Sequence, residues 1–166
     1  MVFYSSLSHC YRLKCFIINT QLDFRTFYKN IIQYGNFKLK SGIESNIYID
    51  LRKVISFPKL HKEICNKIME KINPDIDLIC GTPYGAVSYA SYISITKNIP
   101  MIFLRKEQKN HGTKKMIEGN YESNNKVVLI EDVTTTGSSV FEAIDNLELH
   151  GLKVTQIITI ISRNVN

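Results

Sequence analysis

The sequence predicts a single α/β domain with a central, mostly parallel sheet flanked by helices. Two stretches carry this prediction, residues 76–80 and 127–130, because each is a short apolar run that leads into a glycine-containing loop and then into a helical pattern. Repeated strand–loop–helix units are typical of parallel sheets covered by helices. At 166 residues the chain is long enough for one well-buried domain and too short for two of ordinary size.

The remaining elements follow from apolar spacing and from turn residues. Apolar residues three and four positions apart predict helices at 23–34, from 58 onward, at 86–96 and after 139. Short apolar or alternating runs predict a hairpin around Ser41 and Gly42 within 37–50, and strands at 76–80, 100–104, 127–130 and 154–161. The apolar residues expected to bury the second and the last helix are Leu60, Ile64, Ile68 and Ile72, and Val140, Ala143, Ile144 and Leu147.

Composition is that of a cytoplasmic globular protein without a membrane span. Hydrophobic residues make up 44% of the chain and charged residues 22%, with no apolar run of 18 residues. A net charge of +6 fits either nucleic acid or a polyanionic small substrate. The cations concentrate in residues 105–115 without interleaved aromatics, which favours the small substrate over nucleic acid. The four cysteines have no C-x-x-C spacing, so neither zinc nor a disulfide framework is indicated.

Residues 1–22 are predicted to be an N-terminal extension, and residues 23–166 the folded domain. The extension contains no acidic residue, which is the composition of an organellar presequence, and an extended or wrongly chosen start explains it equally well.

The junction at residues 127–139 carries the strongest functional signal. An apolar strand ends in two carboxylates, Glu131 and Asp132, and continues through a hydroxyl-rich loop around Gly137 into a helix. A helix N-terminus presents unpaired N–H groups, so this loop suits a phosphate, whereas the carboxylates suit sugar hydroxyls or a metal ion. A Walker loop and a dinucleotide loop are excluded by spacing. An ordinary strand-to-helix turn is the alternative reading.

Two further segments suit anions. Residues 81–85 form a second loop between a predicted strand and a helix. Residues 105–115 hold five cations in eleven positions and should form a mobile loop that orders over a polyanion, although a solvated charge run is the common alternative.

The sequence around Glu131 and Asp132 resembles the phosphoribosyl-diphosphate (PRPP) signature of type I phosphoribosyltransferases. The hood segment Phe-x-Leu-Lys-Ser-Gly, followed by Ser-x-Ile-Tyr-Ile-Asp-Leu-Arg, and the loop Arg-Lys-Glu-x-Lys-x-His-Gly from Arg105 resemble the orotate phosphoribosyltransferases. The resemblance runs from about Asp23 to Arg163. It implies the type I phosphoribosyltransferase fold with a small hood from the N-terminal segment, and transfer of phosphoribose from PRPP to orotate in UMP biosynthesis.

The resemblance also implies the role of each site residue. Lys109, His111 and Asp132 would be catalytic. PRPP would be bound by Lys40, Tyr84, Arg105, Lys106, Lys109, His111, Glu131, Asp132, Thr134, Thr135, Thr136, Gly137, Ser138 and Ser139. Orotate would be bound by Lys40, Tyr48, Thr135 and Arg163. The cofactor would be Mg²⁺, bound through PRPP and not directly by the protein.

The resemblance further implies a homodimer with shared active sites and an orotidine monophosphate decarboxylase as a fused or separate partner. Gly85 stands where one branch carries lysine, so the chain resembles the branch that includes bifunctional UMP synthase. The pattern departs at Asn46, where the family usually has proline, and at Ser162, where it has aspartate before Arg163. The family's following glycines, helix and strand are absent, so either the chain is a truncated product or its C-terminal edge is finished some other way; a missing edge element would leave unpaired backbone groups. A non-catalytic PRPP-binding relative and a transferase for another base remain alternatives.

Overall fold

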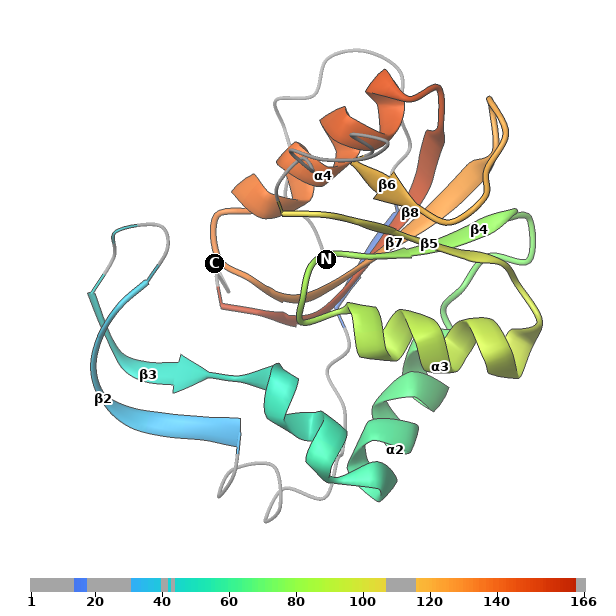
Figure 1. Ribbon diagram of the computed structural model, residues 1–166. Helices are drawn as coiled ribbons and strands as arrows, with labels where there is room; N and C mark the ends of the chain where they lie inside the picture. Colours follow the sequence, from blue (N-terminus) through green and yellow to red (C-terminus); the bar gives the residue numbers. More distant parts are fainter. Residues whose placement is uncertain (1–13, 18–30, 40–41, 43, 107–115, 164–166) are drawn as a thin grey trace.

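A six-stranded sheet forms the centre of the fold, with helices on both faces (Figure 1). The computed structural model describes residues 14–17, 31–39, 42, 44–106 and 116–163. Their helical elements are η1 (Leu51–Ser56), α2 (Pro58–Met69), α3 (Val87–Lys97) and α4 (Ser138–Leu149). Their strands are β1 (Lys14–Ile17), β2 (Ile32–Lys38), β3 (Glu44–Ile49), β4 (Leu78–Gly81), β5 (Met101–Leu104), β6 (Ile117–Glu118), β7 (Lys126–Thr134) and β8 (Lys153–Ser162).

The strand order places the two anion-suited loops next to each other. The sheet runs β1-β8-β7-β4-β5-β6, and all neighbours are parallel except β5 and β6. From β4 the chain passes to β5 on one side and later returns to β7 on the other side. In open α/β sheets, ligands bind at such a switch point, outside the carboxyl ends of the strands. The predicted α/β fold with a mostly parallel sheet is confirmed.

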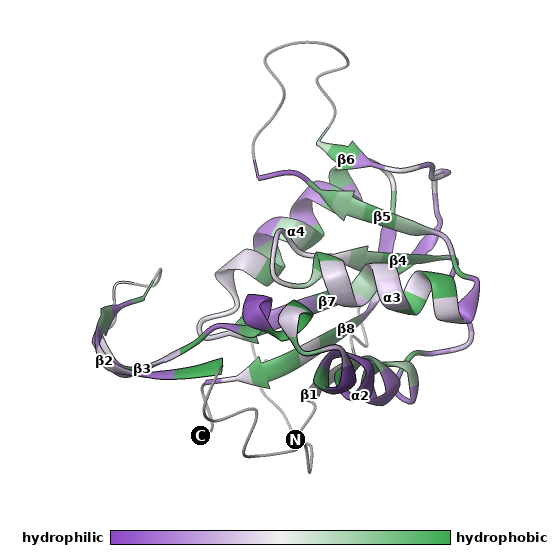
Figure 2. Ribbon diagram, turned by 60° about the horizontal axis from the view of Figure 1, so that its bottom comes forward, coloured by the Kyte–Doolittle hydropathy of each residue, from purple (hydrophilic) through white to green (hydrophobic). Residues whose placement is uncertain are grey.

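Alternating residues of the central strands bury the two faces of the sheet. Ile79 and Val128 pack with α2 and α3, whereas Cys80 and Leu129 pack with α4 on the opposite face. Figure 2 shows the hydrophobic residues concentrated on the strands of this sheet. Of the core residues predicted from helical spacing, all are buried except Ile72, which lies beyond α2 and packs against the core while partly exposed. Among the described residues, no helix is long and apolar enough to cross a membrane.

The hood is a separate antiparallel pair, β2 and β3, that projects from the sheet (Figure 1). One hydrogen bond closes its base, and a second ties that base to α3. The Asp50 N–H donates to the Ile31 carbonyl at 2.9 Å, and the buried Tyr89 hydroxyl of α3 donates to the Leu51 carbonyl at 3.0 Å. These bonds fix where β3 leaves the hood and η1 begins.

The prediction of a helix that reaches Tyr34 is wrong at its C-terminal end. Residues 32–38 form β2, in which Ile32 pairs with Ile49 and Tyr34 with Ile47. β-branched and aromatic residues favour strands, and pairing with β3 overrides the local helical spacing. Residues 23–30, where the helix was predicted to begin, lie outside the described residues.

The sheet edge beside β8 is paired with β1. β1 falls within the predicted N-terminal extension and runs parallel to β8, with Lys14 opposite Gln156 and Ile17 opposite Thr159. No strand was predicted there, because a four-residue apolar run has no clear period.

Candidate active site

A cavity of about 240 Å³ lies at the carboxyl ends of β4 and β7, beneath the hood. It is lined by residues from the hood and the turn that follows it, from the loops after β4 and β7, from the segment after β5 and from the end of β8. The lining residues are Leu39, Tyr48, Ile49, Asp50, Arg52, Pro83, Tyr84, Gly85, Lys106, Asp132, Val133, Thr135, Thr136, Gly137, Ser138, Ser139 and Arg163.

The two carboxylates at the end of β7 occupy different environments. Asp132 lines the cavity and accepts a hydrogen bond from the Val133 N–H at 2.8 Å. Glu131 is only 4% exposed, and its Oε2 atom has no partner among the described residues. Burial, followed by the neighbouring Asp132, raises the pKa of Glu131 to about 8. Glu131 is therefore mostly protonated near neutral pH in this state, and Asp132 is the carboxylate that lines the cavity.

The loop from Thr135 to Ser139 forms the wall opposite the hood. Gly137 has φ of 81°, a left-handed conformation that glycine adopts without strain, and it turns the chain into α4. No side chain caps this end of α4, and the Thr136 and Ser138 hydroxyls lie 3.1 Å apart at its start. A helix N-terminus surrounded by hydroxyls suits a phosphate group.

The loop after β4 is held against β7. The Thr82 N–H and hydroxyl both contact the Ile130 carbonyl, at 3.0 and 3.3 Å. Gly85 follows, and a Cβ atom added there would overlap the Asp132 carboxylate. Next to it, the Lys106 ammonium lies 4.8 Å from the centre of the Tyr84 ring. A cation at that distance is attracted by the ring and adds positive charge at the rim of the cavity.

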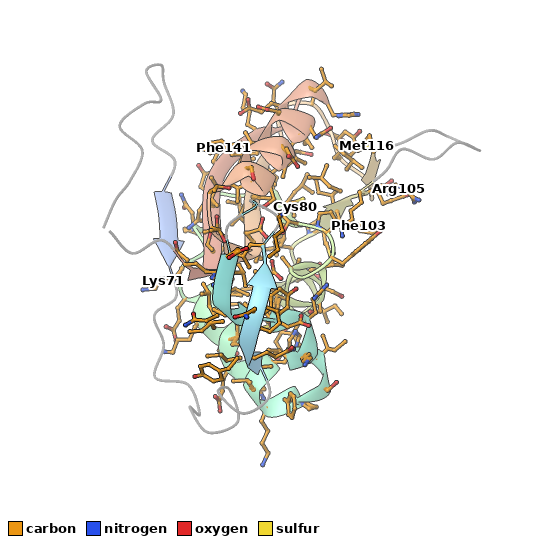
Figure 3. All side chains as sticks on the ribbon, turned by 90° about the vertical axis from the view of Figure 1, so that its left-hand side faces the viewer. Lys71, Cys80, Phe103, Arg105, Met116 and Phe141 are labelled. Carbon is orange, nitrogen blue, oxygen red and sulfur yellow. The ribbon has the colours of Figure 1, made fainter. Side chains whose placement is uncertain are left out.

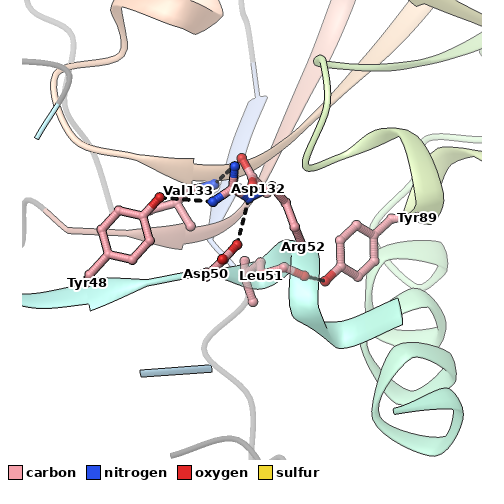
Figure 4. Close-up of polar contacts among 7 residues, drawn as sticks. All are labelled: Tyr48, Asp50, Leu51, Arg52, Tyr89, Asp132 and Val133. Atoms are coloured by element: carbon pink, nitrogen blue, oxygen red, sulfur yellow. Dashed lines mark hydrogen bonds and ion pairs between the residues drawn. The ribbon is translucent and has the colours of Figure 1, made fainter. Parts of the chain in front are cut away.

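The hood contributes a linked set of polar side chains to the cavity (Figure 4). Arg52 donates from Nε to Asp50 Oδ1 at 2.6 Å and from Nη2 to the Tyr48 hydroxyl at 3.0 Å. Hydrogen bonding to Asp50 raises the pKa of Arg52 further, so the guanidinium stays charged.

Arg163, at the end of β8, joins the hood to the sheet. Its Nη2 atom donates to Ser45 Oγ at 2.6 Å and to the Ile47 carbonyl at 2.9 Å. The Arg163 N–H also donates to the Thr134 carbonyl at 2.9 Å, which ties β8 to the end of β7. One arginine thereby fixes the position of β3 over the cavity.

Most of the residues predicted for the site lie around this cavity, and several lie elsewhere. Arg105 does not line it: its Nη1 pairs with Glu118 Oε1 at 2.8 Å, and Arg105 lies beside Met116 (Figure 3). It borders a second cavity of about 300 Å³ with Tyr84, Phe103 and Lys106. Glu131 and Thr134 lie behind the lining residues. Lys40, Lys109 and His111 are outside the described residues.

Sequence reasoning missed the roles of Asp50 and Arg52. Both belong to the quoted hood segment, but no contact was assigned to either one. Alternation in β3 places Tyr48 and Asp50 on one face of the strand, and that spacing is the signal that could have marked them. The position of Arg52 depends on η1, which the sequence analysis did not predict.

Comparison with known proteins identifies relatives over most of the chain. The family model "Phosphoribosyl transferase domain" matches residues 58–166. An orotate phosphoribosyltransferase of Pyrococcus horikoshii is 44% identical over 135 residues, which are 80% of this chain and 73% of that protein. The uridine 5'-monophosphate synthase of Bos taurus is 40% identical over 134 residues, 79% of this chain and 28% of the bovine protein. The crystal structure of orotate phosphoribosyltransferase from Aeropyrum pernix superposes with a TM-score of 0.74 at 26% identity, covering 84% of this chain and 81% of that one.

Proposed function

The chain belongs to the orotate phosphoribosyltransferases, within the phosphoribosyl transferase domain family, and we propose that it transfers the 5-phosphoribosyl group of PRPP to orotate. The products are orotidine 5'-monophosphate and diphosphate. The observation that carries the proposal is one cavity that joins a carboxylate, Asp132, a hydroxyl-lined helix N-terminus and the guanidinium of Arg163. These groups match the ribose, phosphate and carboxylate of the reactants.

The lining residues divide among the parts of PRPP. Asp132 accepts hydrogen bonds from the ribose hydroxyls, with Glu131 behind it. Residues 135–139 and the N-terminus of α4 bind the 5'-phosphate through hydroxyls and backbone N–H groups. The loop at Tyr84 and Gly85, with Lys106, binds the diphosphate. These segments are far apart in the sequence, and they meet at one cavity because β7 and β4 are neighbours in the sheet. Their convergence supports this division.

The chemistry requires stabilisation of two opposite charges. Breaking the bond from ribose C1 to diphosphate places positive charge on the sugar and negative charge on the leaving oxygens. Asp132 lies where it can stabilise the sugar, and Lys106 where it can stabilise the leaving group. Lys109 and His111, which were predicted to close over the site, are proposed to complete the cationic side and to exclude water.

The residues present fit a Mg²⁺ ion that enters with PRPP. Magnesium is commonly bound through substrate phosphates, which PRPP itself supplies, and Asp132 is an oxygen acceptor on the cavity wall for the ribose beside them. When bound, Mg²⁺ would neutralise charge on the diphosphate. Asp132 would orient the ribose hydroxyls next to that ion.

A homodimer with shared active sites remains part of the proposal, because Lys109 and His111 belong in this family's pattern to the neighbouring subunit. Light scattering coupled to gel filtration measures the oligomeric state. A decarboxylase partner is also proposed, since orotidine 5'-monophosphate still carries the carboxylate that UMP lacks, and the bovine relative is named for UMP synthesis.

The test mixes the purified protein with orotate, PRPP and Mg²⁺ and follows the loss of orotate absorbance. Loss of absorbance in proportion to enzyme, with formation of orotidine 5'-monophosphate, is the expected result, and Asp132→Asn is the control that keeps the fold and removes the carboxylate. Tight PRPP binding without turnover would establish the non-catalytic alternative. Turnover of hypoxanthine or uracil in preference to orotate would show that the base is a different one.

A further inference from the structure

The Tyr48 hydroxyl lies between Arg52 and the cavity. Tyr48 lines the cavity from β3, and its ring packs against Phe37 of β2 with ring centres 5.4 Å apart. The oxygen of the hydroxyl accepts a hydrogen bond from Arg52 Nη2 at 3.0 Å. Both the ring and the hydroxyl are therefore held in place before any substrate binds.

Arginine can only donate, and this determines what the tyrosine can do. A guanidinium has five N–H donors and no acceptor, whereas a tyrosine hydroxyl has one proton and can accept as well. Because Arg52 donates to a lone pair of the Tyr48 hydroxyl oxygen, the proton of that hydroxyl must point away from Arg52. Among the described residues no acceptor for it is found, and the open side of the hydroxyl is the cavity.

Arg52 is itself held on three sides. Asp50 Oδ1 accepts from its Nε at 2.6 Å, and the two residues before it are anchored through the Asp50 N–H, which donates to Ile31, and the Leu51 carbonyl, which accepts from Tyr89. Although the Arg52 side chain is 56% exposed, these contacts set the direction of its planar fork.

We propose that Arg52 is a positioning residue for the base: it holds the Tyr48 hydroxyl as a hydrogen-bond donor aimed at an acceptor oxygen of orotate. The proposal rests on the proposed function. It assigns Arg52 no contact with PRPP and no part in breaking the bond to diphosphate. A base that offered an N–H group at the same place would meet a second donor and be disfavoured.

A double-mutant cycle with Tyr48→Phe, Arg52→Lys and the double variant tests the proposal. Lysine keeps the charge near Asp132 but cannot contact Asp50 and Tyr48 with one planar fork. Losing one such hydrogen bond corresponds to roughly a tenfold effect. We expect each single variant to raise KM for orotate about tenfold, while KM for PRPP and the thermal midpoint stay near wild type.

The double variant decides whether the arginine acts through the tyrosine. We expect it to resemble Tyr48→Phe, with about a tenfold and not a hundredfold rise in KM for orotate. The control is Lys53→Gln, which removes a positive charge from the same turn at an exposed position that does not line the cavity, and should leave both KM values unchanged.

Three outcomes would overturn the proposal. If the two increases in KM for orotate multiply in the double variant, Arg52 contacts substrate independently of Tyr48. If Arg52→Lys leaves KM for orotate unchanged, Arg52 does not position Tyr48. Equal rises in both KM values with a lower thermal midpoint would mean a purely structural role. An active wild-type enzyme with any of these results refutes this proposal alone, whereas a wild-type protein that does not turn over orotate refutes the proposed function and this inference with it.

Discussion

The backbone of Gly85 lies directly against the carboxylate of Asp132, so that a Cβ atom at position 85 would overlap the Asp132 side chain. This contact joins the loop after β4 to the end of β7. The lack of a side chain at position 85 is therefore what allows Asp132 to occupy its place on the cavity wall.

Gly85→Ala should displace the Asp132 carboxylate without unfolding the protein. A displacement of about 1 Å at a reacting group can cost about a hundredfold in rate, and we expect kcat/KM to fall by that order. Steady-state kinetics and a thermal melt are the measurements. If Gly85→Ala acts through Asp132, combining it with Asp132→Asn should lower kcat/KM little below that of Asp132→Asn alone. Full multiplication of the two effects would contradict this explanation.

The extent to which the sequence predicts this site depends on the range of each interaction. The loop around Gly137 was predicted because strand, hydroxyls and helix follow one another directly in the chain. The contact between Gly85 and Asp132 could not be predicted, because it depends on β4 and β7 being neighbours although their residues are far apart in sequence. The pairing of Arg105 with Glu118 was missed for a similar reason, since it requires the short strand β6.

The spacing of apolar residues also predicted the wrong element where a helical and a strand pattern overlap. Ile31 and Tyr34 continue a helical spacing, yet Tyr34 belongs to β2, since residues 32–38 gain a partner strand in β3. The core helices were predicted well because their apolar faces are long and regular, as for Val140 to Leu147 in α4.

Glu131 should make the stability of the protein fall as pH rises. Its pKa is raised to about 8 by burial, so between about pH 4.5 and 8 the folded protein holds a proton that the unfolded chain has released. The stabilisation is fully present below the unfolded pKa and is lost as pH rises through the folded pKa. Glu131→Gln mimics the protonated form. Its thermal midpoint should exceed that of wild type by a difference that grows as pH increases from 5 to 9.

Thermal melts across that range measure the effect. Glu148→Gln, which removes an exposed carboxylate from α4, is the control for the loss of one negative charge. A difference between Glu131→Gln and wild type that stays constant with pH would show that Glu131 does not hold a proton in the folded protein.

Arg163 should stabilise the hood even without substrate. Its Nη2 atom donates to Ser45 and to the Ile47 carbonyl, and these bonds connect β3 to the end of β8. Arg163→Met keeps the length of the side chain but has no donor for either contact, and we expect hydrogen exchange in β3 to become about tenfold faster, as the loss of roughly one hydrogen bond predicts. Mass spectrometry of the exchanged peptides is the measurement, with β4 as the internal reference. Unchanged exchange in β3 would mean that other contacts hold the hood.

The strand β1 joins residues 14–17 to the central sheet, and deletion tests the importance of this pairing directly. Its backbone pairs with residues 156–159 of β8, and without it that edge of the sheet would expose unpaired N–H and C=O groups. Removing residues 1–17 should therefore lower the thermal midpoint by about 5–10 °C, as expected for the loss of a few hydrogen bonds in a domain of this size. It should also increase aggregation on heating.

The matched control removes residues 1–12 and leaves β1 in place, so its melting temperature should equal that of the full chain. A deletion of residues 1–17 that melts like the full chain and stays monodisperse would contradict a structural role for β1. That result would instead favour the reading of residues 1–22 as a dispensable presequence, because a segment that is removed in the mature protein cannot be needed to complete its sheet.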